Sequence, residues 1–182
     1  MEPRSVEDLL EAQKAGTLPK YLFFWGHRPH PSGRHVLSQW FERDFTDPAT
    51  GGRVYRSAEH YMMAGKARLF GNAETEELIL ASGHPDEAKR LGRRVRGFDE
   101  EIWAGHRFEL VVRGNTAKFG GDPELREYLL GTGGRVLVEA SPLDRVWGVG
   151  LTADDERAAD PARWEGLNLL GFALMEARAR LR

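Results

Sequence analysis

The sequence predicts an α+β fold with a helical majority, a single domain with a small sheet. Three observations predict this class. Stretches of strand type are few, and most of them lie within residues 21–55. Helix-start and helix-stop signals follow one another through most of the remaining chain. The regular alternation of strand and helix that a doubly wound fold requires does not occur.

The first elements are predicted from local residue chemistry. Ser5 and Asp8 have the spacing of a capping box and predict a short helix. We assign this helix to an N-terminal appendage, residues 1–20, which precedes the main domain, residues 21–182. The aromatic run 21–25 is typical of a strand, and the Pro-, His- and Gly-rich stretch after it predicts a loop. Further strand-type stretches are 35–45 and 53–55, around the turn residues Asp47-Pro48 and Gly51-Gly52.

Helices then predominate, and most are predicted from the residue that caps the start. Asp122 followed by Pro123 is the strongest start signal, because proline is favoured at the first helical position. The predicted starts and approximate ends are Ser57 to Phe70, Asn72 to Gly83, a short helix after Pro85, Asp99 to Phe119, Asp122 to Gly131, and a C-terminal helix over 167–181. Residues 135–139 alternate like a strand, and 141–150 form a loop.

Composition excludes several classes of protein. The 182 residues carry 26 Lys plus Arg against 28 Asp plus Glu, a net charge of −2, which does not indicate a nucleic-acid coat protein. The absence of cysteine excludes disulfides, thiolate metal sites and thiol nucleophiles. No apolar run approaches the roughly 18 residues of a membrane helix, and charges occupy the place of a signal peptide's apolar stretch. We therefore expect a cytoplasmic protein with no membrane partner.

Several standard sites are also excluded. No G-x-S-x-G elbow occurs, which argues against an α/β-hydrolase. His27, His30 and His35 lie on a Pro-rich loop with no acidic or thiol ligand beside them, so we expect no metal ion. No cofactor is expected.

Glu59 and Lys66 are the most informative ionisable pair. On a helix capped by Ser57 they lie seven residues apart, which places them on one face. The rise between them is about 10.5 Å, too far for an ordinary ion pair along the helix. Either both side chains reach toward a shared ligand from different heights, or the pair lies on a solvated face and carries two unrelated charges.

For Trp103 and the loop 141–150, the sequence likewise leaves open whether the role is ligand binding or structure alone. The Trp103 indole is either a core residue or a platform for a planar ring. In the loop, Asp144, Trp147 and Gly148 either form part of a pocket or shape a structural turn. A basic stretch that includes Arg90, Arg93 and Arg94 is either a solvated surface or an edge that binds phosphate or DNA.

Six motifs in register carry a family resemblance. They are Ser57-Ala58-Glu59-His60-Tyr61 with Lys66, Lys89 to Arg93, Trp103, Asn115 with Lys118-Phe119, Asp144 with Trp147 to Gly150, and Gly166 to Gly171. In order and spacing the chain resembles the NADAR (YbiA-like) family from about Tyr21 to Arg182. The segments Phe23 to His27 and Leu37 to Trp40 depart from the Phe-Ser-Asn-Phe opening of the YbiA branch and indicate another branch.

The resemblance implies a YbiA-like α+β fold and cleavage of N-glycosidic bonds. Family substrates are phosphorylated ribosylamino intermediates of riboflavin synthesis or ADP-ribose on guanine bases of nucleic acid, so ADP-ribosylated DNA is a candidate partner. By the resemblance, the catalytic residues are Glu59, Lys66, Trp103 and Asp144. The substrate-binding residues are Tyr61, Asn115, Trp147, Gly148 and Asn168.

The residue types suit this chemistry. Breaking a ribosyl C–N bond passes through an oxocarbenium-like state, which calls for a carboxylate near C1′ and an acid for the departing base. Lys66 either binds an anionic oxygen or attacks as an amine, forming a Schiff base with the opened ribose. The leading hypothesis is a hydrolase acting on N-glycosyl bonds. The alternatives are a non-catalytic ADP-ribose or NAD-binding module and a scaffold protein.

Overall fold

The computed structural model describes residues 3–16 and 19–182. They divide into two compact units, which are described separately. The central unit is Gln39–Arg126, and the terminal unit comprises the chain up to Ser38 together with Glu127–Arg182. In the described part of the chain, no helix has the length and apolar character needed to cross a membrane.

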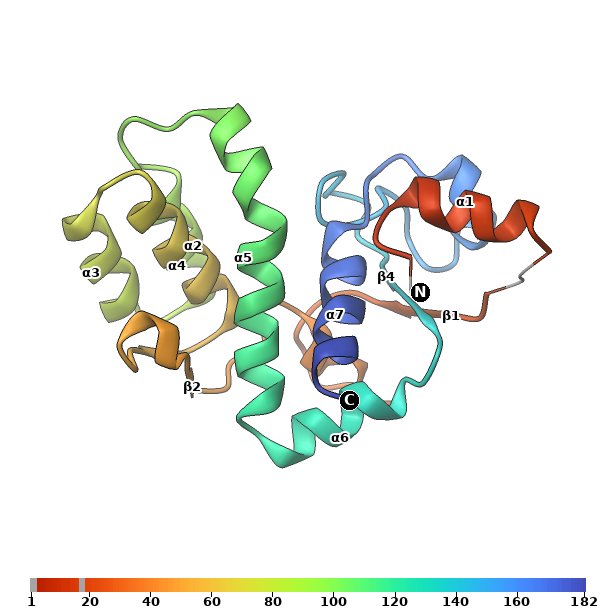
Figure 1. The fold of residues 1–182 in the computed structure, drawn as a ribbon, viewed down its shortest axis with the longest axis horizontal. Coiled ribbons are helices and arrows are strands. Elements are labelled where there is room, and N and C mark those ends of the chain that lie inside the picture. The colour runs from red at the N-terminus through yellow and green to blue at the C-terminus, as the bar shows by residue number, and fades with distance from the viewer. Residues whose placement is uncertain (1–2, 17–18) are drawn as a thin grey trace. The chain divides into compact units, whose positions relative to one another are not determined.

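The central unit is a group of helices around α2. Its helices are α2 (Ala58–Leu69), α3 (Ala73–Ala81), α4 (Pro85–Gly92) and α5 (Glu100–Gly120), and α6 (Pro123–Gly131) begins at its C-terminal end. Helix α2 packs against α3, α4 and α5 (Figure 1). A short antiparallel pair precedes the helices, β2 (Phe45–Thr46) with β3 (Val54–Tyr55).

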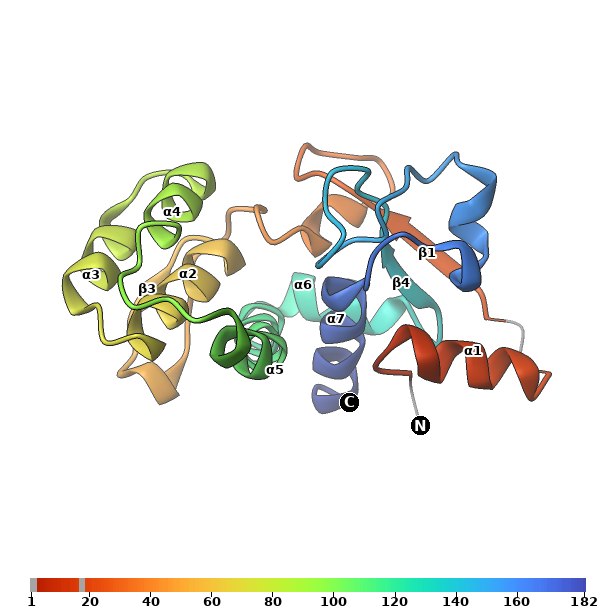
Figure 2. The same cartoon turned by 90° about the horizontal axis from the view of Figure 1, so that it is seen from above.

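The terminal unit is built on a parallel pair of strands. Strand β1 (Tyr21–Phe24) pairs with β4 (Val136–Glu139), with Tyr21 opposite Val136 and Phe24 opposite Glu139. Helix α7 (Leu169–Arg180) packs against β4, as Figure 2 shows from above. Helix α1 (Val6–Lys14) contributes the buried Leu9.

Local capping confirms where the main helices begin. The Ser57 hydroxyl accepts a hydrogen bond from the His60 N–H at 3.3 Å, and this starts α2. The Asp99 carboxylate accepts from the Ile102 N–H at 2.9 Å, and this starts α5. Both bonds satisfy amides that the first helical turn leaves without a partner. The predicted α+β class, with helices in the majority and a small sheet, is confirmed.

Three local expectations were wrong. The strand-type stretch 35–45 instead begins with a 3-10 helix, Arg34–Leu37, and only Phe45 and Thr46 extend a strand. Gly33 has a left-handed φ of 74° that turns the chain into this helix, and Val36 and Leu37 are both buried, so burial does not alternate as in a strand.

The second and third errors concern caps. Asn72 stands at the start of α3 but makes no capping bond, because its side-chain amide donates to the carbonyl groups of Phe70 and Arg96. Ser5 does cap α1, yet the Asp8 carboxylate accepts from the Arg4 N–H rather than returning to Ser5. The boundary of the appendage, 1–20, stays a prediction, and its residues 1–2 and 17–18 lie outside the described part.

Two glycines of α5 provide a matched test of this packing. A Cβ at Gly114 would lie 2.5 Å from the Tyr61 ring of α2, whereas a Cβ at Gly105 would meet nothing within 4 Å. We expect Gly114→Ala to destabilise the protein by about 1–3 kcal/mol through overpacking. Gly105→Ala should stabilise it by about 0.5–1 kcal/mol through helix propensity. Urea unfolding measures both, and equal shifts would contradict the close contact of α2 with α5.

Candidate active site

Helix α2 carries the two ionisable residues that the sequence predicts on one helix face. Glu59 lies in the first turn of α2 and Lys66 two turns later. The Glu59 N–H donates to the Gln39 carbonyl group at 2.9 Å, and only 3% of Glu59 is exposed. Burial at this level argues against the interpretation of Glu59 as a charge on a solvated face.

The Lys66 amine lies among aromatic rings. Its Nζ is 4.1 Å from the centroid of the Phe98 ring and 5.6 Å from that of Trp103. Burial lowers the pKa of Lys66, and the nearby positive charge of Arg93 lowers it further, while Glu100 acts in the opposite direction. A lysine with a lowered pKa supplies more neutral amine at a given pH, and this is the form that attacks a carbonyl-type carbon.

Phe98 is a residue that the sequence reasoning missed. It precedes the N-cap residue Asp99 and packs against Phe70 with ring centroids 5.4 Å apart. An aromatic residue immediately before a helix cap was the available signal. That position alone does not reveal its contact with Lys66, which lies more than thirty residues earlier in the chain.

Asn115 and Tyr61 lie inside the central unit and support α2. The fully buried Asn115 donates from Nδ2 to Gln39 Oε1 and to the Val111 carbonyl group, both at 2.9 Å. Since Gln39 also accepts from the Glu59 N–H, Asn115 helps to fix the start of the helix. The Tyr61 hydroxyl donates to Asp47 Oδ2 at 2.6 Å. Their predicted contact with substrate stays a prediction.

In the terminal unit, Asp144 organises the loop after β4. One carboxylate oxygen, Oδ1, accepts from the N–H groups of Val146 and Trp147, at 2.9 and 2.8 Å. The side chain is partly exposed, and within the described chain its other oxygen, Oδ2, makes no hydrogen bond. Asp144 can therefore hold the turn with one oxygen and present the other to a ligand.

Gly148 and Asn168 fix this loop against β4. A Cβ at Gly148 would lie 2.8 Å from the Glu139 carbonyl oxygen, so the close approach requires glycine. Asn168 has a left-handed φ of 52°, and its side chain accepts from the Glu139 N–H and donates to the Leu137 carbonyl group, both at 2.9 Å. Its N–H donates to the Gly148 carbonyl group. Asn168 thus positions the loop, and its expected contact with substrate stays a prediction.

The predicted site residues fall into two sets. The central unit holds Glu59, Tyr61, Lys66, Trp103 and Asn115, and the terminal unit holds Asp144, Trp147, Gly148 and Asn168. The structure brings Lys66 and Trp103 together within the first set, and ties Asp144, Trp147, Gly148 and Asn168 together within the second. That the two sets form one pocket stays a prediction.

The basic stretch lies beside Lys66. Arg90 pairs with Asp86 at 3.1 Å on the surface of α4, and Arg93 and Arg94 follow at its exposed end. The charge of Arg93 acts on Lys66, as the lowered pKa of Lys66 indicates. In residues 3–16 and 19–182, no group of three or more histidine, aspartate or glutamate side chains could hold a metal ion.

Comparison with known proteins identifies the family. The family model described as NADAR domain matches residues 23–182. The chain belongs to this family. It is 44% identical over 161 residues to N-glycosidase R617 of Acanthamoeba polyphaga mimivirus, covering 87% of this chain and 95% of that protein. The NMR structure of the E. coli protein YbiA matches with a TM-score of 0.68 at 25% identity, covering 91% of this chain and 86% of YbiA.

A third relative is named for riboflavin biosynthesis and not as an N-glycosidase. The chain is 36% identical over 135 residues to the chloroplastic riboflavin biosynthesis protein PYRR of Zea mays. The aligned region covers 70% of this chain but only 20% of that protein. The NADAR resemblance and the YbiA-like fold are confirmed. The expectation of a hydrolase acting on N-glycosyl bonds is confirmed at the level of the family, whose members include proteins named N-glycosidase.

The two roles of Asp144 can be separated by substitution. Asp144→Ala removes the acceptor of two backbone N–H groups and should destabilise the protein by about 1–2 kcal/mol. Asp144→Asn keeps an oxygen at the Oδ1 position and should unfold at nearly the wild-type urea concentration. An asparagine variant as unstable as the alanine variant would show that the charge, and not the acceptor, holds the loop.

Proposed function

We propose that this NADAR protein is an N-glycosidase that cleaves a ribosyl C–N bond. The observation that supports this most is the Lys66 amine, held beside the rings of Phe98 and Trp103 with a lowered pKa, on the same helix as the buried Glu59. The names of the similar proteins R617 and YbiA support the same reaction class. A cytoplasmic location, expected from composition, belongs to this proposal as well.

In the proposed reaction, Lys66 Nζ attacks C1′ of the ribosyl group and forms a C–N bond. The bond from C1′ to the base breaks, its electron pair passes to the base nitrogen, and a protonated carboxyl group supplies the proton. Glu59 and Asp144 share the acid and charge-stabilising roles. The C1′–O4′ bond then opens, its electron pair passes to O4′, and a proton from Nζ moves to O4′, which leaves a Schiff base between Nζ and C1′. Water adds to C1′, the C1′–Nζ bond breaks, and the lysine is released as an amine. The Trp103 ring stacks on the planar base.

Two substrate classes suit this chemistry. One is ADP-ribose attached to guanine in nucleic acid. It is favoured by the exposed charges of Arg93, which acts on Lys66, and of the next residue, Arg94, because such charges suit a phosphate backbone. The other is a ribose-phosphate N-glycoside such as a riboflavin intermediate, and the similarity to PYRR favours it. A non-catalytic ADP-ribose or NAD-binding module is the alternative function, although a reader of an anionic ligand gains nothing from two carboxylates.

The deciding experiment offers both substrate classes to the purified protein. A DNA oligonucleotide carrying ADP-ribosylated guanine and a phosphorylated ribosylamino pyrimidine are incubated separately, and the released ribosyl product is quantified by chromatography. Release from either one supports the glycosidase and names its substrate class. Tight binding of ADP-ribose with no release from either substrate would favour the non-catalytic module instead.

Removing the charge of each carboxylate tests its role in turnover. Glu59→Gln and Asp144→Asn are nearly isosteric, and each should lose turnover on the order of 10²-fold or more, because neither amide can donate a proton as an acid does. The unfolding midpoint of each variant provides the control for folding. A Glu59→Gln protein that cleaves at the wild-type rate would remove Glu59 from the mechanism.

Trapping and substitution at Lys66 distinguish covalent from electrostatic catalysis. Because its pKa is lowered from 10.5, we expect cleavage by the wild type to rise with pH through a value below that of free lysine. Borohydride added during turnover should trap an adduct on Lys66, located by peptide mass spectrometry. Lys66→Arg keeps the charge but cannot form the Schiff base, so it should be nearly inactive. Substantial activity in Lys66→Arg, with no adduct in the wild type, would leave only the electrostatic role.

A further inference from the structure

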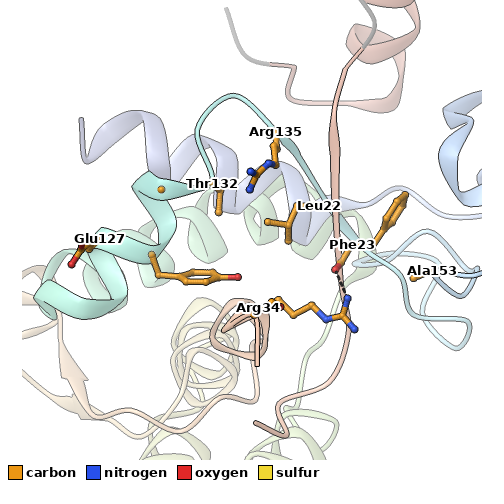
Figure 3. Close-up of a pocket in the computed structure, with 10 residues that line it drawn as sticks. Leu22, Phe23, Arg34, Glu127, Thr132, Arg135 and Ala153 are labelled. Atoms are coloured by element: carbon orange, nitrogen blue, oxygen red, sulfur yellow. Dashed lines mark hydrogen bonds between the residues drawn. The ribbon is translucent and has the colours of Figure 1, made fainter. Parts of the chain in front are cut away.

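The terminal unit contains a cavity of about 680 Å³ that none of the predicted site residues lines. Its walls come from β1, from the 3-10 helix that begins at Arg34, from α6, and from the turn that leads into β4 (Figure 3). Leu22 and Tyr128 supply apolar and aromatic surface, Phe23 contributes its carbonyl group, and Arg34 and Arg135 supply positive charge.

The positive charges of Arg34 and Arg135 are not neutralised by an ion pair within the described chain, so they can bind an anionic ligand. Arg34 makes one long hydrogen bond, 3.5 Å, to the Phe23 carbonyl group. Both charges act on the same phenol. Burial raises the pKa of Tyr128, while Arg34 and Arg135 both lower it. Both guanidinium groups therefore lie within electrostatic range of the Tyr128 hydroxyl, and Figure 3 shows that of Arg34 directed to the Phe23 carbonyl group and that of Arg135 near Thr132.

Hydrogen bonds and close packing fix the backbone segments that carry Arg34 and Arg135. The fully buried Arg178 donates from Nη1 to Thr132 Oγ1 at 2.7 Å and to the Arg135 carbonyl group at 3.0 Å, which fixes the turn that carries the Arg135 side chain. Gly33 precedes Arg34 with a left-handed φ, and a Cβ there would lie 2.7 Å from the Tyr128 ring. The ring and the segment that bears Arg34 are thus packed against each other.

One acidic side chain lines the cavity in the described chain, and its direction limits its effect. Glu127 is exposed on α6. Figure 3 shows its carboxylate pointing away from Arg34 and Arg135. The cavity therefore keeps a net positive charge beside apolar and aromatic walls.

We propose that this cavity binds a nucleoside phosphate, with Arg34 and Arg135 on the phosphate and the surfaces of Leu22 and Tyr128 against the nucleoside. Guanidinium groups bind phosphate oxygens with paired, charge-assisted hydrogen bonds. The volume lies within the roughly 300–1,000 Å³ of small-molecule pockets, and an inorganic phosphate alone would leave most of it empty. The ligand is either a free nucleotide or the terminal nucleotide of a nucleic-acid strand, and both present the same groups.

This site does not depend on the glycosidase reaction. None of its residues belongs to the predicted catalytic or substrate-binding sets, so the cavity could be occupied whether or not the protein cleaves a substrate. Its test therefore measures binding directly, and cleavage serves only as a separate readout.

Titration calorimetry with adenosine monophosphate tests the proposal. Arg135→Ala and Arg34→Ala should each weaken binding about tenfold or more, because each removes a charged hydrogen-bond donor. Arg163→Ala is the matched control, since it removes an equal charge from an exposed pair with Glu156 and lies outside the cavity. It should bind as the wild type does, and any cleavage activity should persist in Arg135→Ala.

Further probes identify the source of the phosphate. Inorganic phosphate and adenosine should each bind more weakly than adenosine monophosphate if both halves of the cavity are used. A short oligonucleotide with a 5′-phosphate that binds more tightly than the mononucleotide, with the same loss in Arg135→Ala, would identify a nucleic-acid end as the ligand. Wild-type affinity in both folded arginine variants, or no binding of either nucleotide probe, would overturn the proposal.

Discussion

Burial of α2 on most of its circumference is the constraint from which the central unit follows. Nine of its twelve residues are buried, and α3, α4 and α5 all pack against it. Glycines permit this approach, because a Cβ at Gly65 or at Gly114 would collide with Leu110 or with Tyr61. Glu59 and Lys66 both lie on this packed helix, so the separation of their backbone positions along its axis is set by helix geometry.

The same burial lowers the pKa of Lys66. Helix polarity favours a carboxylate near the start of α2 and a cation near its end, and Glu59 and Lys66 follow that arrangement. By itself this arrangement would be explained by stability alone. Yet the pKa of Lys66 is lowered, so desolvation outweighs the attraction of Glu100. Helix stability does not explain a lysine buried where its charge is disfavoured, and this placement suits the role of amine nucleophile that we propose for Lys66.

The sequence predicted what depends on near neighbours and failed where distant residues decide. The caps Ser57 and Asp99 act within three residues, and both were predicted. Asn72 looked equally convincing as a cap, but its amide bonds to Arg96, twenty-four residues away. The candidate site shows the same division. The family resemblance identified Asn115 and Asn168 as site residues. Only the structure shows that the Asn115 amide bonds to Gln39 and that the Asn168 amide bonds to the backbone of β4.

Arginine and lysine are used unevenly in this chain, and burial affects the charges of the two residue types differently. Lysines number only five, and burial lowers the pKa of two of them, that of Lys66 and that of Lys118, the latter to about 7. A guanidinium group cannot lose its charge in this way, and arginines form surface ion pairs with Asp86 and Glu156 and line the terminal unit's cavity. At Lys66 and Lys118 a lysine can therefore lose its proton more readily than in water, which an arginine there could not do. Substitution of arginine for Lys66 therefore changes the chemistry available to the site while keeping its charge.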